Sequence, residues 1–329
     1  MGLLLLDRAN LEVKAEGETL ALYEAGERRG TVPIAFIDRC VIHGSQTRLD
    51  TGVLMKLAEA GVSTVLMSTR QTRRVAIVLG VQHNDASVRL AQALRVVDEA
   101  WCFTWAREVV RAKLARQQKV LQTLQQHRLD ARKPLSDALK TVKRIHKTLE
   151  TIPKIPTLDK LRGKEGAAAN AYFSGLASVM PPILGFNGRN RRPPRDPVNV
   201  CLSLAYTMLH IQAVQTCVAV GLDPFLGFYH RPAFGRESLA CDLIEPLRAA
   251  VDLWIWELLR TRTLRENHFS NANNACLLGK AGRQIFYTQW SEASKPWQRW
   301  LRNQAMALAR DLRGTGQHWM SGDDEDAIE

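Results

Sequence analysis

Three short segments, far apart in the sequence, carry polar side chains in apolar surroundings. Glu165 opens a run of small residues, from Gly166 to Ala171, that would let another helix or a ligand approach closely. His230 ends a largely apolar segment. Asp242 and Glu245 are three positions apart, so they share one face of a helix. Two neighbouring carboxylates repel each other unless a cation lies between them, so this pair predicts a cation site.

Carboxylates combined with one imidazole suit Mg²⁺ or Mn²⁺ better than a structural zinc, which prefers thiolates and histidines. A metal held by Glu165, His230 and Glu245 or Asp242 would suit phosphodiester chemistry, because it would polarise a phosphoryl oxygen and activate water or a 3′-hydroxyl. Simpler interpretations stay open. Glu165 fits an acid favoured near a helix N-terminus, and His230 fits a structural histidine. Asp242 and Glu245 fit a surface acidic pair matched by Arg248.

Basic residues gather in two regions. The loop 185–196 holds four arginines within seven residues: Arg189, Arg191, Arg192 and Arg195. Two prolines, Pro193 and Pro194, stiffen this loop and lower the entropy cost of presenting guanidinium groups to phosphates. The segment 107–147 carries twelve bases and three acids over several helix faces, which fits either a solvated surface or a track for a DNA backbone.

The net charge favours a polyanionic partner. The chain of 329 residues carries a formal charge of +12, and residues 321–329 hold five acids and no base, so residues 1–320 carry +17. Simple solubility is the alternative. Membrane binding has less support, because no basic helix pairs with an exposed aromatic face. The acidic tail fits a disordered segment, a shield for the basic surface or a docking site for a partner.

Nothing in the sequence predicts export or a membrane-spanning segment. No stretch reaches the roughly 18 apolar residues that a bilayer requires, and the apolar opening is too short for a signal peptide. The six cysteines form no CxxC pair, which favours buried reduced thiols over disulfides or zinc. We therefore expect a cytoplasmic protein.

Hydrophobic periodicity divides the chain into two parts and predicts the α+β class. Residues 1–82 form a small β-rich domain with one helix at Thr51–Ala60. Its expected strands are Leu3–Leu6, Leu11–Ala15, Thr19–Tyr23, Val32–Ile37, Cys40–Ile42, Ser63–Met67 and Val75–Leu79. Residues 83–329 form a larger, all-helical domain that ends in the acidic tail. Its expected helices are 84–99, 100–127, 134–150, Leu158–Met180, Pro197–Val220, Ser238–Arg262 and Arg283–Arg313, with a bend after Glu245 at Pro246.

Four segments in a fixed order resemble the CRISPR-associated adaptation nuclease/integrase family, and the resemblance covers most of the chain. Glu165–Phe173 looks like the family's glutamate helix, and Asn187–Asn199 looks like its Arg-Pro-Pro loop. Gly221–Pro232 is similar to its histidine motif, and Ser238–Arg248 to its acidic helix.

The resemblance implies catalytic metal ligands at Glu165, His230 and Glu245, with Asp242 as a supporting or alternative ligand. Glu245 stands where some members carry an aspartate. The family fold is an N-terminal β domain followed by a helical domain, and the first domain is the expected site of dimerisation. Members form homodimers, and two dimers clamp a small ferredoxin-like partner dimer in a heterohexamer.

The implied activity is Mg²⁺- or Mn²⁺-dependent cleavage and strand transfer on double-stranded DNA. A protospacer 3′-hydroxyl attacks the leader–repeat junction of a CRISPR array. Further expected DNA contacts are Tyr172, Arg189, Arg191, Arg192, Arg195, Arg231, Arg236, Arg248, Lys280 and Arg283. Helix packing explains Tyr172 equally well. A non-catalytic DNA-binding scaffold is the main alternative, and a helical interaction protein with a merely basic surface is a third.

Overall fold

The computed structural model of the protein describes residues 2–43, 46–67, 74–80, 83, 85–151, 157–190, 193–272 and 274–321. The chain divides into two compact units. The first comprises Met1–His83 with Phe286–Ser294, and the second comprises Asn84–Ile285 with Lys295–Glu329. The sequence prediction assigned all residues after 82 to one helical domain and did not anticipate that a late helical segment would group with the first unit.

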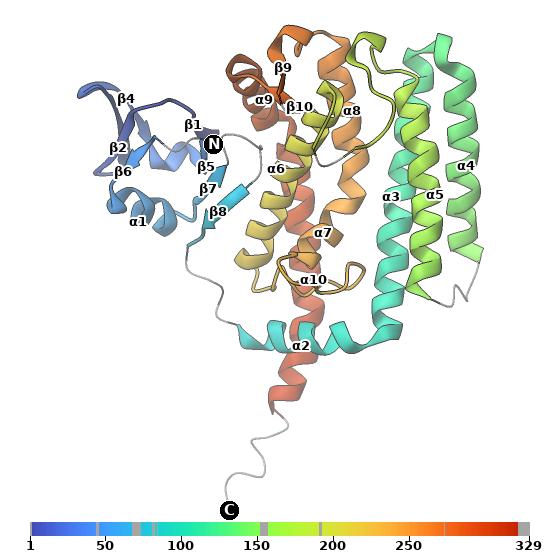
Figure 1. The fold of residues 1–329 in the computed structure, drawn as a ribbon. Coiled ribbons are helices and arrows are strands. Elements are labelled where there is room, and N and C mark those ends of the chain that lie inside the picture. Colours follow the sequence, from blue (N-terminus) through green and yellow to red (C-terminus); the bar gives the residue numbers. More distant parts are fainter. Residues whose placement is uncertain are drawn as a thin grey trace, which may run out of the picture. The chain divides into compact units, whose positions relative to one another are not determined.

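The first unit contains two four-stranded sheets (Figure 1). One sheet has the order β1-β5-β7-β8, with parallel pairing except between β7 and β8. The other has the order β4-β3-β2-β6, antiparallel except between β2 and β6. The bounds are β1 Gly2–Leu6, β2 Leu11–Glu16, β3 Thr19–Glu24, β4 Glu27–Pro33, β5 Ile37–His43, β6 Arg48–Leu49, β7 Ser63–Met67 and β8 Arg74–Val78, with helix α1 at Thr51–Glu59.

Alternating apolar residues account for the core of this unit. Val13 of β2 and Leu20 of β3 are fully buried and pack with Leu57 of α1 in one cluster. One expected strand is wrong in its bounds. The segment Val32–Ile37 leaves β4 at Pro33, forms a 3₁₀ turn at Ile34–Phe36 and enters β5 at Ile37. Pro33 has no backbone N–H to donate to a strand ladder, which explains the end of β4 there.

The second unit is mainly helical. Its elements are α2 Ala86–Val97, α3 Glu99–His127, α4 Arg132–Thr151, α5 Leu158–Ala177, α6 Pro197–Ala219, α7 Ser238–Ile244, α8 Arg248–Arg260 and α10 Lys295–Ser321, while α9 Lys280–Ala293 is shared between the units. In Figure 1 α3, α4 and α5 run side by side, and α2 crosses α10. Two strands, β9 Phe269–Ala272 and β10 Ala275–Leu278, form a small antiparallel hairpin, so this region is not entirely helical as predicted.

Two predicted helices are each divided in the structure. Ser238–Arg262 is interrupted by a 3₁₀ turn at Glu245–Leu247, because Pro246 cannot donate the helical hydrogen bond at that position. Arg283–Arg313 consists of the end of α9 and most of α10, which meet at Ser294. The break after α7 matters for the site, because it sets Glu245 at a change of helix direction.

Helix α6 is long and apolar enough to cross a membrane by length and composition alone, with 23 residues. It is, however, 78% buried within its most apolar window. Asp196 caps its first turn by accepting a hydrogen bond from the backbone N–H of Asn199 at 2.8 Å, and Pro197 occupies the first helical position. These features describe the central core helix of the second unit.

Candidate active site

Two carboxylates from distant segments meet on one ammonium group. Lys113, near the middle of α3, donates to Oε1 of Glu165 on α5, and its Nζ lies 2.6 Å from Oε2 of Glu245. All three side chains are largely withdrawn from solvent, with exposed fractions of 11% for Lys113, 21% for Glu165 and 7% for Glu245. The expected acidic pair was Asp242 with Glu245, but the pair that shares a cation is Glu165 with Glu245, and that cation is a lysine of the protein itself.

Glu245 is held in its charged form by two bases. Arg248 donates from Nε to Oε1 of Glu245 at 2.8 Å. Burial by itself would raise the pKa of Glu245, but Arg248 and Lys113 outweigh it and hold this pKa well below its usual range. The guanidinium of Arg248 also lies 4.5 Å from the ring centroid of Tyr206, a cation–π contact that fixes its position. Glu245 is therefore an anion at neutral pH.

Asp242 anchors the loop that carries His230. Its carboxylate is fully buried in α7, and Oδ2 accepts hydrogen bonds from the backbone N–H groups of Phe228 at 2.8 Å and Tyr229 at 2.9 Å. Its Oδ1 accepts the backbone N–H of His230 at 2.9 Å and lies 2.7 Å from the ring Nδ1. An ionised carboxylate only accepts hydrogen bonds, so Nδ1 carries a hydrogen and Nε2 is left as the ring nitrogen that can act on a ligand.

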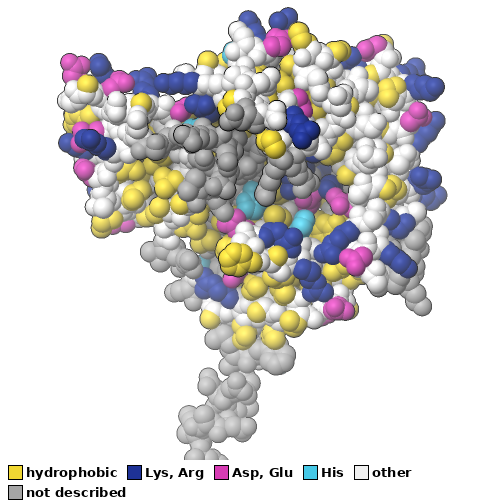
Figure 2. Space-filling model, viewed as in Figure 1, with side chains coloured by type: hydrophobic (Ala, Val, Ile, Leu, Met, Phe, Trp, Pro, Cys, Tyr) yellow, Lys and Arg dark blue, Asp and Glu magenta, His cyan; other side chains and the backbone are white. Residues whose placement is uncertain are grey.

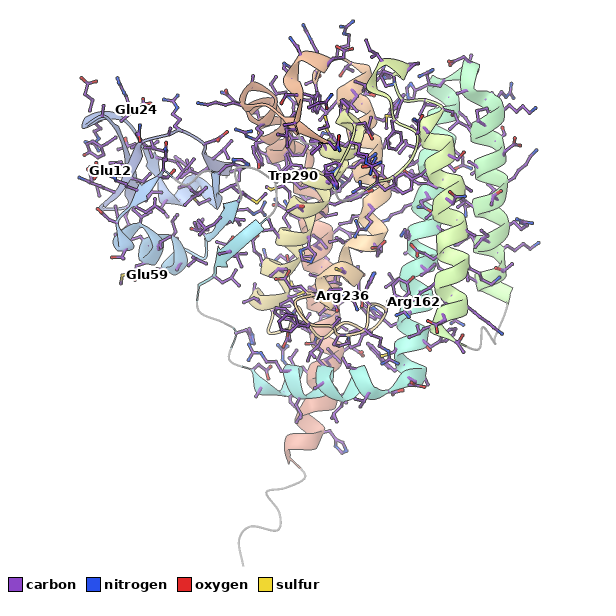
Figure 3. The ribbon with its side chains drawn as sticks, viewed as in Figure 1. Glu12, Glu24, Glu59, Arg162, Arg236 and Trp290 are labelled. Carbon is purple, nitrogen blue, oxygen red and sulfur yellow. The ribbon has the colours of Figure 1, made fainter. Side chains whose placement is uncertain are left out.

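The histidine loop is also tied to Glu165. The hydroxyl of Tyr229 donates to Oε2 of Glu165 at 3.3 Å. Burial and the nearby Glu165 raise the pKa of Tyr229, which keeps this phenol protonated as a donor. Arg162 donates from Nη2 to the backbone oxygen of Tyr229 at 3.1 Å, and Figure 3 labels it beside this loop. Glu165, His230 and Glu245 are thus linked by direct contacts through Lys113, Tyr229 and Asp242.

The donor set fits a divalent cation in part. Among the residues that the structure describes, no three His, Cys, Asp or Glu side chains already lie together in the manner of a metal site. Two carboxylates nevertheless share one cation position, which Lys113 occupies. Asp242 differs from them, because both of its oxygens are engaged by the histidine loop. This makes Asp242 a support for His230 in this arrangement and not an open ligand.

Tyr172 corrects one expected DNA contact. Its side chain is fully buried inside the second unit, where it packs against Phe173 with a centroid distance of 5.3 Å. A ring with no exposed surface cannot touch DNA, so the surface role predicted for Tyr172 is wrong, and the alternative of helix packing holds.

The expected basic contacts divide into engaged and exposed groups. Four arginine side chains bind groups of the protein: Arg189 bonds Asn199, Arg231 bonds the Val96 oxygen, Arg248 bonds Glu245, and Arg283 bonds the Leu278 oxygen. Three residues are exposed, Arg195, Arg236 and Lys280, although Arg236 also donates to Ser238 and to the backbone oxygen of Arg231. Arg191 and Arg192 lie outside the described residues. The exposed three stay predictions for phosphate contact.

The sequence contained a signal for Lys113 that the prediction did not use. Val110, Leu114 and Gln117 are buried on one face of α3, and Lys113 lies on that face. A lysine within an apolar stripe requires a buried partner, since an isolated ammonium is costly to remove from water. The pairing with Glu165 and Glu245 meets that requirement.

The family of the chain follows from its similarity to known proteins. A family model described as CRISPR associated protein Cas1 matches residues 4–292. The chain belongs to the Cas1 family. It is 34% identical over 302 residues to a CRISPR-associated endonuclease Cas1 of Thermodesulfovibrio yellowstonii, covering 90% of this chain and 93% of the relative. A second Cas1 endonuclease, from Rhodospirillum rubrum, is 32% identical over 326 residues and covers 92% of each chain.

Solved structures show the same fold. A casposase bound to integration product matches with a TM-score of 0.82 at 21% identity, covering 96% of this chain and 91% of that one. A Cas1 protein of Thermotoga maritima matches with a TM-score of 0.81 at 22% identity, covering 95% and 97%. The β region followed by a mainly helical region, expected from the sequence, is therefore the Cas1 fold.

Proposed function

We propose that the protein is a divalent-metal-dependent DNA endonuclease and integrase. In this proposal it inserts protospacer DNA into a CRISPR array by attack of a 3′-hydroxyl at the leader–repeat junction. The observation that carries the proposal is the meeting of Glu165 and Glu245 on one cation position beside an oriented histidine. Membership of the Cas1 family, whose curated relatives are named endonucleases, supports the nuclease part.

The residues that would hold Mg²⁺ or Mn²⁺ are Glu165, Glu245 and His230 through Nε2. When bound, such an ion would polarise a phosphoryl oxygen and lower the pKa of a water or hydroxyl nucleophile. The oxygen-rich donor set with one imidazole is suited to these ions. Asp242 supports this role from behind the histidine, because carboxylate partners of ligating histidines fix the ring tautomer and orientation.

The chain's own residues keep the site ready for an ion and a phosphate. Arg248 holds Glu245 ionised, so no proton has to leave before the carboxylate binds a cation. Lys113 balances the two acids while they are withdrawn from water, and an ion bound by both carboxylates would take over the position of its ammonium group. Tyr229 holds Oε2 of Glu165 on the side of the histidine loop. The positive charge of Lys113 also favours an approaching phosphate.

The proposed partners are duplex DNA, a second copy of the chain and a small ferredoxin-like protein. Protospacer and leader–repeat duplexes would use the exposed Arg195, Arg236 and Lys280 for phosphate contacts. One similar solved structure is a complex named Cas6-RT-Cas1–Cas2, with a TM-score of 0.77 at 20% identity over 95% of this chain and 35% of that one. The first unit is the proposed site of homodimerisation, and two dimers with the small partner would form a heterohexamer.

A half-site integration assay tests the proposal. Purified protein, with and without its small partner, is given a protospacer with free 3′ ends and a leader–repeat duplex in Mg²⁺ or Mn²⁺. Glu165→Ala and His230→Ala should abolish joining and cleavage while DNA binding persists. Glu59→Gln on α1, in the other unit, is the matched acidic control and should join DNA like the wild type.

The same assay separates the alternatives. A protein that binds duplex DNA but neither joins nor nicks it with any divalent ion would be a binding scaffold. Binding that does not weaken as salt rises would contradict phosphate recognition, because released counterions make such binding salt-dependent. That outcome would favour an interaction protein with a merely basic surface.

A further inference from the structure

One aromatic side chain stands fully in solvent close to the candidate site. Phe234 has an exposed fraction of 108%, which means that it is more exposed than in a reference peptide. Among the large apolar residues in the described part of the chain, Val97 comes next with 76%. Large aromatic rings are usually buried at least in part, because they contribute the most apolar area to a core. An aromatic ring held wholly in water gains nothing for folding and is available for a partner.

The turn that presents Phe234, residues 231–236, is well fixed. Ala233 and Arg236 pair as an antiparallel bridge, and the backbone N–H of Arg236 donates to the oxygen of Ala233 at 3.0 Å. Gly235 has a φ of 67°, in the left-handed region that favours glycine. Arg236 donates from Nε to Oγ of Ser238 at 3.1 Å and also to the backbone oxygen of Arg231. The ring is therefore carried on a braced turn, which limits the entropy lost on binding.

The turn begins directly after His230. Asp242 fixes the backbone of His230, and Arg231 donates from Nη1 to the oxygen of Val96 at 2.8 Å. Four residues of extended chain span at most about 14 Å, so Phe234 lies within that distance of His230 along the backbone. Nucleotides of one strand repeat about every 3.4 Å. A base within roughly four nucleotides of a phosphate at His230 is within reach of the ring.

The surroundings favour nucleic acid over an apolar protein segment. Arg231 and Arg236 flank Phe234 in the sequence with no acid between them, and Arg231 also lies 3.5 Å from Oε1 of Glu99. Figure 2 shows Lys and Arg side chains interspersed with apolar and acidic ones on one face of the molecule, and Figure 3 labels Arg236 on the loop below α7. A nucleotide offers a ring face and a phosphate together, which matches an aromatic ring on a turn that begins and ends with an arginine.

We propose that Phe234 stacks on an unpaired DNA base next to the reacting phosphate and holds the strand splayed there. This inference rests on the proposed function and adds a positioning residue to it. Aromatic or apolar side chains that enter a base step unstack it and bend or open the duplex. Stacking on an aromatic side chain is tolerant of base identity, so Phe234 would select an opened strand and not a sequence.

The test uses the full-length protein and DNA carrying 2-aminopurine, a base whose fluorescence falls when it stacks, at each of the first four unpaired positions beside the joining site. Wild-type protein should quench one position. Phe234→Ala should lose that quenching and weaken binding to splayed-end DNA about tenfold, with blunt duplex affinity unchanged. Phe234→Trp should retain quenching and affinity. Ile183→Ala, which removes another exposed apolar side chain of the same unit, is the control and should behave like the wild type.

Several outcomes would overturn the inference. Equal quenching by Phe234→Ala and wild type excludes stacking, and so does full function of Phe234→Leu, which keeps apolar bulk without an aromatic face. A change in sedimentation mass of Phe234→Ala with unchanged DNA quenching assigns the ring to a protein contact. The joining activity of the wild type, lost in Glu165→Ala, is measured in parallel. If joining persists in the wild type while Phe234→Ala shows no defect, only the inference fails.

Discussion

The Nζ atom of Lys113 lies 2.6 Å from Oε2 of Glu245, although the two residues are 132 positions apart in the sequence. The same ammonium donates to Glu165, so one lysine neutralises two acids that come from different helices. Burial would lower the pKa of Lys113, but Glu245 and Glu165 outweigh it and raise this pKa above its usual value. Lys113 therefore stays charged at the pH of any ordinary assay.

Removing this charge should make the stability of the protein depend on metal. Lys113→Met leaves two buried carboxylates without their shared cation, which should reduce the free energy of unfolding by about 3–5 kcal/mol in chelator. Mg²⁺ or Mn²⁺ should restore much of that loss, because an ion that binds only the folded state stabilises it. Urea denaturation with chelator and with Mn²⁺ measures both effects. Lys119→Met, an exposed lysine on the same helix, is the control. If Mn²⁺ stabilised Lys113→Met no more than it stabilises the wild type, the shared cation position would be refuted.

Asp242 should matter for rate more than for DNA affinity. Asp242→Asn replaces one acceptor oxygen by an NH₂ group, which would face N–H donors of the histidine loop. We expect the joining rate to fall by about 10–100-fold, as for other carboxylates that orient a ligating histidine. Asp137→Asn, at an exposed position on α4, should leave the rate unchanged. Nitrogen NMR of the His230 ring should report a mixture of tautomers in Asp242→Asn. An unchanged spectrum with a normal rate would rule out the orienting role.

The sequence predicted the site's acids better than its cations. Glu165 and Glu245 stood out because carboxylates are unusual in small-residue and apolar helical surroundings. Lys113 did not stand out, because the surrounding segment contains so many basic residues that composition could not distinguish one lysine from the others. Its position on the buried face of α3 was the discriminating feature. Spacing could not show that α3, α5 and the end of α7 converge, since tertiary packing decides which helix faces meet.

The errors in the fold have local causes. Periodicity alone merged α9 with α10 across Ser294. The bend predicted at Pro246 is confirmed, and the structure forms it as a 3₁₀ turn between α7 and α8. The hairpin of β9 and β10 was missed because its strands have only four residues each and β9 is largely exposed. Short exposed strands lack the alternation that predicts a sheet.

Gly227 should be intolerant of even one added methyl group. A Cβ atom there would lie 2.5 Å from the carbonyl carbon of Ser238 and 2.7 Å from the backbone oxygen of His230. Because both neighbours are backbone atoms, relief requires a shift of the histidine loop or of α7. Gly227→Ala should cost roughly 1–3 kcal/mol of stability and abolish joining. Gly163→Ala on α5 is the control, because a Cβ there meets no atom within 4 Å. Thermal melting and the joining assay on both variants decide the matter, and wild-type behaviour of Gly227→Ala would contradict the close approach.

Asp85 should contribute stability that is lost in acid. Its Oδ1 accepts hydrogen bonds from Ser87, and its Oδ2 lies 2.6 Å from Nε of Arg313 on α10. These hydrogen bonds, first from Ser87 and then from Arg313, lower the pKa of Asp85 to about 2. Because its pKa is lowered, Asp85 stabilises the folded state at pH values above the ordinary aspartate pKa of about 3.9. This stabilisation disappears as the pH falls toward 2. Solvent screening limits it to about 1 kcal/mol. Asp85→Asn keeps the capping oxygen and should flatten this acid dependence in urea melts between pH 2 and pH 5; an unchanged slope would contradict it.

Asp252 should produce the opposite dependence. It is almost fully buried in α8, where it accepts a hydrogen bond from the hydroxyl of Tyr206. Burial raises its pKa to about 6, against the individually smaller lowering effects of Tyr206, Tyr172 and Arg248. The folded state therefore holds a proton that the unfolded chain releases near pH 4, and stability falls as the pH rises from about 4 to about 6.

Asp252→Asn removes that titration while keeping an oxygen that accepts from Tyr206. The free energy of unfolding of Asp252→Asn minus that of the wild type should increase by about 2 kcal/mol from pH 4 to pH 7.5. Each unit of pKa shift corresponds to about 1.4 kcal/mol. Urea denaturation of both proteins at the two pH values measures the difference. Tyr206→Phe, which deletes the hydrogen bond that favours the charged form, should steepen the fall in stability with pH. If the difference between Asp252→Asn and wild type were the same at both pH values, the carboxyl would titrate normally and the buried proton would be excluded.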